Sequence, residues 1–197
     1  MPTTTTPVPV VLSCPNPTDF LHHLLATVRH RTDEEHALII CSPLDTFRQE
    51  AAASNSAADL ATISALSTAQ NVAVTFCPSL LHLRAFLSTI SPPSSPADGG
   101  GVLAVWGLVA AHRETAEFSA QGLGRTAAAL VEAGLRSGRR VLVGERLEGE
   151  EGGEVLLPVL NSTVKVGSRL GEEIAGRTVG VGAVLGRWMV FERIGEA

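Results

Sequence analysis

Short apolar runs alternate along the chain with segments of helical periodicity. Five runs are nearly continuous in apolar residues and rich in β-branched side chains, and they span residues 9–14, 37–41, 72–77, 102–109 and 141–144. Such runs are typical of parallel strands that are buried on both faces of a sheet. The segments between them predict helices at residues 19–31, 44–66, 80–90 and 121–137. These repeated strand–helix units predict an α/β fold, a three-layer αβα core around a mainly parallel sheet.

The pattern changes after Gly144. Residues 148–154 are acidic and glycine-rich, and the apolar runs that follow are short and separated by glycines and by Asn-Ser. These runs span residues 155–160, 163–166, 177–184 and 187–192. We expect them to form C-terminal antiparallel hairpins that complete one edge of the sheet. We therefore divide the chain into a disordered tail, residues 1–8, and a single domain, residues 9–197.

Composition narrows the class of protein. The chain has 197 residues, of which 45% are hydrophobic, so one domain with a substantial core is expected. Its net charge of −5 argues against a protein that coats nucleic acid through bulk charge, but it leaves room for a local basic patch. No apolar run reaches the ~18 residues that a membrane span requires, so we expect no membrane partner. Three widely spaced cysteines suit a reducing compartment.

The cysteines and histidines do not form a clear metal-binding pattern. Cys14, Cys41 and Cys77 each end a predicted strand, so parallel strands would bring them to one edge, where His82 could complete a zinc site. No C-x-x-C chelate is present, and packing in the core is the favoured interpretation. The six histidines are interpreted as solvated or helix-capping, and no metal ligand or catalytic residue is assigned.

A glycine motif offers the strongest alternative. Gly122, Gly124 and Ala127 have the spacing of a dinucleotide-binding turn, and Glu145 stands near the place of a ribose-binding acid. Such a turn must follow a buried strand, whereas residues 113–121 are polar. We therefore favour a helix whose apolar face contains residues 127–131 and Leu135, and we expect no cofactor. A nicotinamide-dependent oxidoreductase remains an alternative.

The order of elements resembles the core of the RecA-type recombinases and their paralogues. The most specific match is ALIICSPLDTFRQE at residues 37–50, which repeats a T-F-R-x-E signature. Three further segments resemble the family in the same order: NVAV at 71–74, VLAVWGLVAAHRE at 102–114 and EFSAQ at 117–121. The matches are short, but they run collinearly through residues 10–193. The resemblance implies a RecA-like domain.

The chain departs from this family where the family binds ATP. CPNPTDF at residues 14–20 replaces the phosphate loop, and it contains no glycine and no lysine. By the resemblance, the catalytic glutamate falls on Leu44 or Asp45, and the magnesium-binding aspartate falls on Trp106. Metal-assisted phosphoryl transfer needs all of these groups. The expected protein is thus not an enzyme, and it retains the fold without ATPase activity.

The resemblance implies a nuclear subunit similar to those of the Shu complex, which helps a recombinase filament assemble on single-stranded DNA. Its expected partners are another RecA-like paralogue, the recombinase filament, and single-stranded or forked DNA. A RecA-like accessory subunit of Elongator, acting in tRNA modification, is the alternative within the same fold. The candidate partner-binding residues are Trp188, Phe20 and Leu24. The candidate DNA-binding residues are Lys165, Arg169, Arg177, Arg187 and Arg193.

Overall fold

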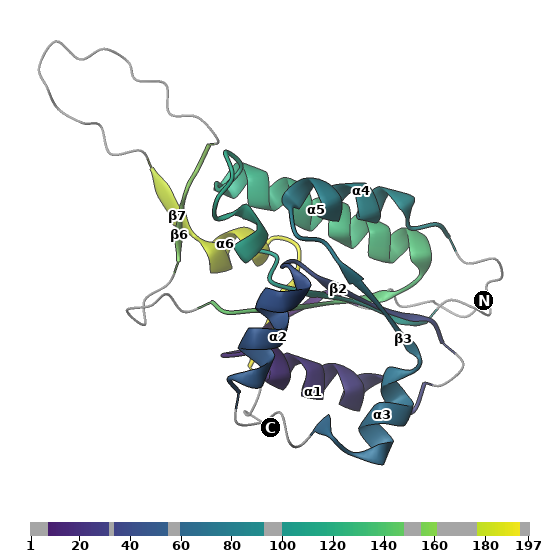
Figure 1. The fold of residues 1–197 in the computed structure, drawn as a ribbon. Helices are drawn as coiled ribbons and strands as arrows, with labels where there is room; N and C mark the ends of the chain where they lie inside the picture. Colours follow the sequence, from purple (N-terminus) through teal and green to yellow (C-terminus); the bar gives the residue numbers. More distant parts are fainter. Residues whose placement is uncertain are drawn as a thin grey trace, which may run out of the picture.

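The computed structural model describes residues 8–31, 34–54, 60–92, 100–147, 155–160 and 177–193. Its centre is a six-stranded sheet with the strand order β3-β2-β4-β5-β1-β8, in which every pair of neighbours is parallel (Figure 1). The strands are β1 (Val10–Ser13), β2 (His36–Ile40), β3 (Val72–Phe76), β4 (Val102–Trp106), β5 (Arg140–Glu145) and β8 (Val190–Arg193). The prediction of an α/β fold with a mainly parallel sheet is confirmed. The expected tail, residues 1–8, lies outside the described residues except for Val8.

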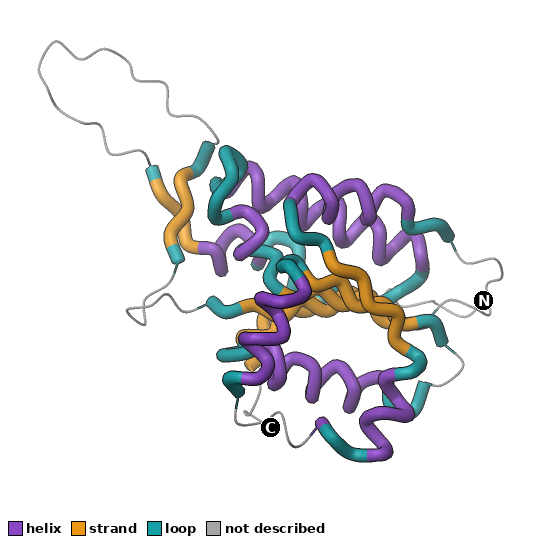
Figure 2. Tube along the Cα trace, viewed as in Figure 1, coloured by secondary structure: helices purple, strands orange, loops and turns teal. Residues whose placement is uncertain are grey.

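Helices cover both faces of this sheet (Figures 1 and 2). One face carries α1 (Pro17–Val28), α2 (Leu44–Ala52) and α3 (Ile63–Ala69), and the other carries α4 (Leu80–Thr89), α5 (Ala120–Ser137) and α6 (Val181–Leu185). The core is divided accordingly into two apolar clusters, one on each side of the sheet. Central strands are buried along their whole length, as their continuous apolar sequences require.

The single helix expected at residues 44–66 is wrong. The chain forms α2, which ends with its C-cap at Ala53, and then α3, which starts after Thr62. The Thr62 side chain accepts a hydrogen bond from the N–H of Ala65, 3.1 Å away, and so caps the second helix. The polar serines and asparagine between the two helices disfavour a continuous helix.

The C-terminal region also differs from the prediction. The strands β6 (Leu156–Pro158) and β7 (Thr178–Gly180) are antiparallel, but they form a separate two-stranded sheet instead of an edge of the main one. The run expected as a strand to residue 184 turns into α6, because Val181, Val184 and Leu185 have helical spacing and bury one face. The last run, β8, joins the main sheet parallel to β1. The run expected at residues 163–166 lies outside the described residues.

The helix α5 packs closely on the sheet because it carries small residues at the contact. A Cβ added at Gly134 would lie 2.3 Å from a methyl group of Val141 in β5. Gly138 ends the helix in the left-handed conformation, with φ 67°, which glycine adopts without strain. The predicted apolar face is confirmed at Ala127 and Leu130 but is wrong at Leu135, whose side chain is 58% exposed.

Candidate functional site

Ligand sites of open α/β sheets lie beyond the carboxyl ends of the strands, where neighbouring strands lead to helices on opposite faces. In this sheet β2 leads into α2, whereas its neighbour β4 leads through a 3₁₀ turn, Ala110–His112, towards α5 on the other face. A nucleotide bound by this sheet would therefore lie at this edge.

The turn from β1 into α1 cannot cradle a phosphate in the way the RecA-type loop does. The Oδ1 of Asn16 accepts a hydrogen bond from the N–H of Asp19, 2.9 Å away, so the amide that a phosphate would use already has a partner. The Nδ2 of Asn16 donates to the Asp19 carboxylate at 2.8 Å, which places a negative charge at the helix start. Pro17, in the first turn of the helix, has no N–H to offer. An anion at this turn would find the Asp19 amide already hydrogen-bonded and would be repelled by the Asp19 carboxylate.

The end of β4 offers no polar side chain to a ligand, because its last residue is Trp106. Trp106, the residue that falls on the metal-binding position of the resemblance, is 6% exposed and packs against Phe20 of α1 with ring centroids 5.6 Å apart. The Phe20 ring fits only because Gly144 faces it: a Cβ at Gly144 would lie 2.3 Å from the ring. An indole offers no oxygen ligand to Mg²⁺. This corner of the edge is filled by aromatic packing.

Glu145 ends β5 and is 4% exposed. Its Oε2 accepts a hydrogen bond from the N–H of Val109 at 2.8 Å, so the carboxylate holds the loop that follows β4. Burial raises the pKa of Glu145 from its usual 4.5 to about 7, although the Val109 N–H and the charges of Arg113 and Arg146 oppose the shift. The side chain is thus engaged inside the protein and does not present a ribose-binding acid.

The three cysteines are buried free thiols at this edge. Burial is the largest cause that raises the pKa of each thiol, to about 12 for Cys14 and well above the usual value for Cys41. Thiols in this state are poor nucleophiles and poor metal ligands. Within the described ranges, no three His, Cys, Asp or Glu side chains come together in a way that could hold a metal ion.

The two glycines of the G-x-G-x-x-A motif lie inside the first turns of α5 and do not directly follow a strand. Ser119 caps the helix and accepts a hydrogen bond from the N–H of Gly122 at 3.0 Å. A Cβ at Gly122 would lie 2.1 Å from the carbonyl oxygen of Glu117, whereas one at Gly124 would meet no atom within 4 Å. Gly122 is therefore required by the packing of the preceding loop on the helix.

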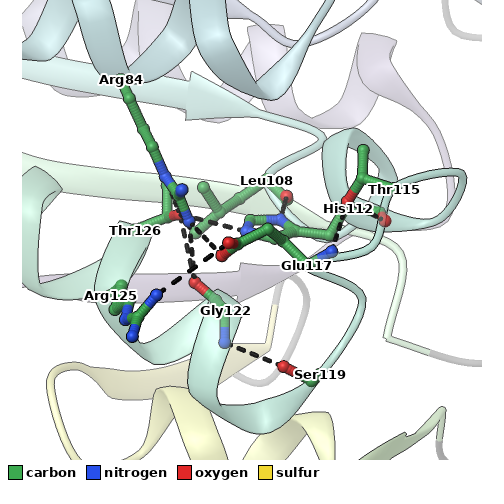
Figure 3. A network of polar contacts seen from close by, with 9 residues as sticks. All are labelled: Arg84, Leu108, His112, Thr115, Glu117, Ser119, Gly122, Arg125 and Thr126. Atoms are coloured by element: carbon green, nitrogen blue, oxygen red, sulfur yellow. Dashed lines mark hydrogen bonds and ion pairs between the residues drawn. The ribbon is translucent and has the colours of Figure 1, made fainter. Parts of the chain in front are cut away.

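A polar network fixes this loop between α4 and α5 (Figure 3). Arg84 of α4 forms an ion pair with Glu117 at 2.9 Å and donates from Nε to the hydroxyl of Thr126 at 3.1 Å. His112 lies beside them, with its Nδ1 2.8 Å from the Leu108 carbonyl oxygen and its Nε2 3.0 Å from the Thr126 hydroxyl. The carbonyl can only accept, so Nδ1 carries the proton of the neutral ring. Nε2 faces the Thr126 hydroxyl, which also donates to the Gly122 carbonyl oxygen at 3.3 Å.

This network was not expected from the sequence. His112 and His36 are 1% and 2% exposed, so the expectation of solvated or capping histidines is wrong for both. The ring of His36 contacts the Arg31 carbonyl oxygen at 3.0 Å and accepts from the Val102 N–H at 3.1 Å. Burial lowers the pKa of His112, and the nearby Arg84 charge adds to this effect. No pattern in the sequence links Arg84 to residues more than thirty positions away.

Among the candidate DNA-binding residues, Arg177 and Arg187 are the two whose side chains the structure describes. Arg177 precedes β7 and Arg187 follows α6, and both are exposed. Because a helix separates them, the strand alternation expected to align them does not apply. Arg193 ends β8, but its side chain lies outside the described residues. Lys165 and Arg169 lie wholly outside them, as does the acidic stretch at 148–154.

The three candidate partner residues have different environments. Phe20 and Leu24 are 0% and 1% exposed and belong to the core between α1 and the sheet, so the expectation that they contact a partner is wrong. Their helical spacing marks the buried face of an amphipathic helix. Trp188 is 41% exposed in the turn before β8, where a partner can reach it.

The protein is thus an α/β protein with a doubly wound parallel sheet. At the carboxyl edge of the sheet, the Asn16 cap, the Trp106–Phe20 ring contact and the buried Glu145 occupy the place of a ligand. The SPAC22G7.03-like family matches residues 8–195, and the chain belongs to this family. No curated protein matches the chain. Among the helices that the structure describes, none is both long and apolar enough to cross a lipid bilayer.

Proposed function

We propose that this protein is a non-catalytic, RecA-like recombinase paralogue, a subunit of a nuclear DNA-repair complex similar to the Shu complex. In this proposal it assists the assembly of a recombinase filament on single-stranded DNA during homologous recombination. The observation that carries the loss of catalysis is the start of α1, where Asn16 uses the Asp19 amide and Asp19 adds a negative charge. The assignment to recombination rests on the sequence resemblance.

The chemistry of ATP hydrolysis supports the non-catalytic part of the proposal. Phosphoryl transfer needs a cradle of amides, a lysine, and acids that hold Mg²⁺ and the attacking water. Here the cradle is capped, the position implied for the metal ligand is the buried indole of Trp106, and Asp45 is exposed at the start of α2. The parts are lost together, so residual catalysis is not expected.

The edge strand β8 offers a surface for a protein partner. The edge strand β8 and the turn before it expose Trp188, Val190 and Phe191, which are 41%, 52% and 37% exposed. Exposed aromatic and aliphatic side chains beside an open strand are typical of a protein interface. We assign this surface to another RecA-like paralogue, which makes the assembly a hetero-oligomer.

The direct test is native affinity purification of the tagged full chain from its own cells, followed by protein identification. A recombinase paralogue and the recombinase are expected with the wild type and with Leu135→Asp, which changes an exposed residue of α5. Both should be lost with Trp188→Asp. Recovery of Elongator subunits in their place would contradict the recombination role and favour tRNA modification. Saturable binding of NAD(H) or NADP(H) by the purified chain would instead favour an oxidoreductase.

A further inference from the structure

The edge strand β3 is unusual because nothing in its sequence protects it. It pairs with β2 on one side, and no other strand in the described part of the chain pairs with it on the opposite side. Natural edge strands are commonly shielded by lysines, prolines or bulges. β3 reads VAVTF, with none of these, and its Val74 is 52% exposed. An open apolar strand edge of this kind is a template for another strand.

The backbone geometry shows which groups are open. The N–H of Cys77, just after β3, donates to the Ile40 carbonyl oxygen of β2 at 2.8 Å. Backbone groups of successive strand residues point alternately to the two sides, so those of Ala73 and Thr75 also point towards β2. Those of Val72, Val74 and Phe76 therefore point outwards. Three residues offer both a donor and an acceptor to an added strand.

The absence of charge around β3 indicates that the added strand comes from a second copy of this chain. In a chain with 18% charged residues, the sequence from Leu60 to Leu81 contains no Asp, Glu, Lys or Arg. This stretch comprises α3 and β3, and it exposes Ile63 and Leu66 to 88% and 61%. Depletion of charge on exposed apolar elements marks the core of an interface. Two copies with a net charge of −5 each can approach here without like charges meeting.

We propose that β3 pairs with β3 of a second copy of this chain, antiparallel and about a two-fold axis at Val74. In this register Val74 faces Val74 of the second copy, and Val72 faces Phe76, an aromatic–β-branched pair that stabilises sheets. All outward donors and acceptors of both strands are then satisfied. The sheet continues across the two copies, and the β8 edges stay open at its two ends.

The test is the oligomeric state of the purified full chain by sedimentation equilibrium. A concentration-dependent dimer is expected, and Val74→Lys should shift it to monomer by placing two like charges at the axis. Leu135→Lys, at a residue of α5 that is 58% exposed and lies outside this charge-free stretch, is the matched control and should remain dimeric. Thermal unfolding by circular dichroism checks that both variants are folded.

A second variant reports the register itself. In this register Val74 and its copy form a hydrogen-bonded pair with Cβ atoms about 5.5 Å apart. A short bifunctional thiol crosslinker should therefore join Val74→Cys between two copies, whereas it should not join Leu135→Cys. The dimer is refuted if the wild type is monomeric at all concentrations, or if Val74→Lys stays dimeric. Open-ended oligomers would indicate β3–β8 pairing instead. Because only the purified chain is used, these outcomes are independent of the proposed role in recombination.

Discussion

At the scale of single residues, the role of a side chain is decided by the atoms that surround it. Gly122, Gly124 and Glu145 first suggest a dinucleotide site. In the structure they are a close packing contact, a helix position with free space, and a buried acid that holds a loop. Their effects on stability should differ in sign accordingly.

The two glycines of the motif should respond in opposite ways to alanine. Gly122→Ala puts a Cβ against the Glu117 carbonyl oxygen and should lower the free energy of unfolding by ~2 kcal/mol. Gly124→Ala meets open space inside a helix and should raise it by ~0.7 kcal/mol, because alanine has the better helix propensity. Urea unfolding measures both. Equal destabilisation by the two changes would contradict the packing role of Gly122.

Glu145 should make stability fall as pH rises. Its pKa is about 7 when folded and 4.5 in its usual state, so the folded chain binds the extra proton between these values. Its contribution is present below about pH 4.5 and is lost as pH rises through about 7. Glu145→Gln should therefore be more stable than the wild type at about pH 8, by on the order of 3 kcal/mol, and similar at about pH 4.

The same comparison separates Glu145 from His112. The lowered pKa of His112 has the opposite consequence, because stability is then lost as pH falls below its usual 6.5. His112 is present in both proteins, so the difference between wild type and Glu145→Gln isolates the acid. If the difference in the free energy of unfolding between the two proteins did not grow with pH, the pKa of Glu145 would not be raised in the folded protein.

At the scale of elements, a loop is held to two helices by polar contacts that involve Arg84, His112 and Thr126 (Figure 3). The segment EFSAQ, one of those that resemble the recombinases, has a structural role here. Its Glu117 pairs with Arg84, and its Ser119 caps α5. These contacts position α5 against α4, and with it one layer of the fold.

Thr126→Val should weaken this layer. The substitution keeps the shape of the side chain but removes the hydroxyl that faces both the Arg84 guanidinium and Nε2 of His112. A buried polar group left without a hydrogen-bond partner costs ~1–3 kcal/mol, so the free energy of unfolding should fall by about 2 kcal/mol. Thr89→Val, at an exposed residue whose hydroxyl bonds to Phe86 of its own helix, is the control and should change it by less than ~0.5 kcal/mol. Equal effects would exclude the network as the cause.

The central strands could be predicted because burial on both faces makes their sequences continuously apolar. The end of the chain could not, because a short apolar run such as residues 181–185 fits a helix or a strand until its neighbours are known. The absence of a glycine- and lysine-containing phosphate loop at residues 14–20 could be read directly from the sequence. The buried histidines and Arg84 depend on contacts between distant residues, which leave no local pattern.

At the scale of the whole molecule, the two proposed associations use the two edges of the main sheet. The β3 edge is uncharged and suits a second copy, whereas the β8 edge exposes Trp188 and suits a different subunit. The layers between them contain a parallel sheet whose carboxyl edge is filled by Trp106, Phe20 and Glu145. This arrangement fits a scaffold that acts through its edges.

The most direct test of the central proposal is the rate at which a recombinase filament nucleates on fluorescently labelled single-stranded DNA, with and without this protein. The wild type, together with its paralogue partner, is expected to accelerate nucleation without hydrolysing ATP itself. Trp188→Asp should abolish the acceleration, and Leu135→Asp should retain it. Nucleation that is unchanged by the wild-type complex, or acceleration that survives Trp188→Asp, would contradict the account.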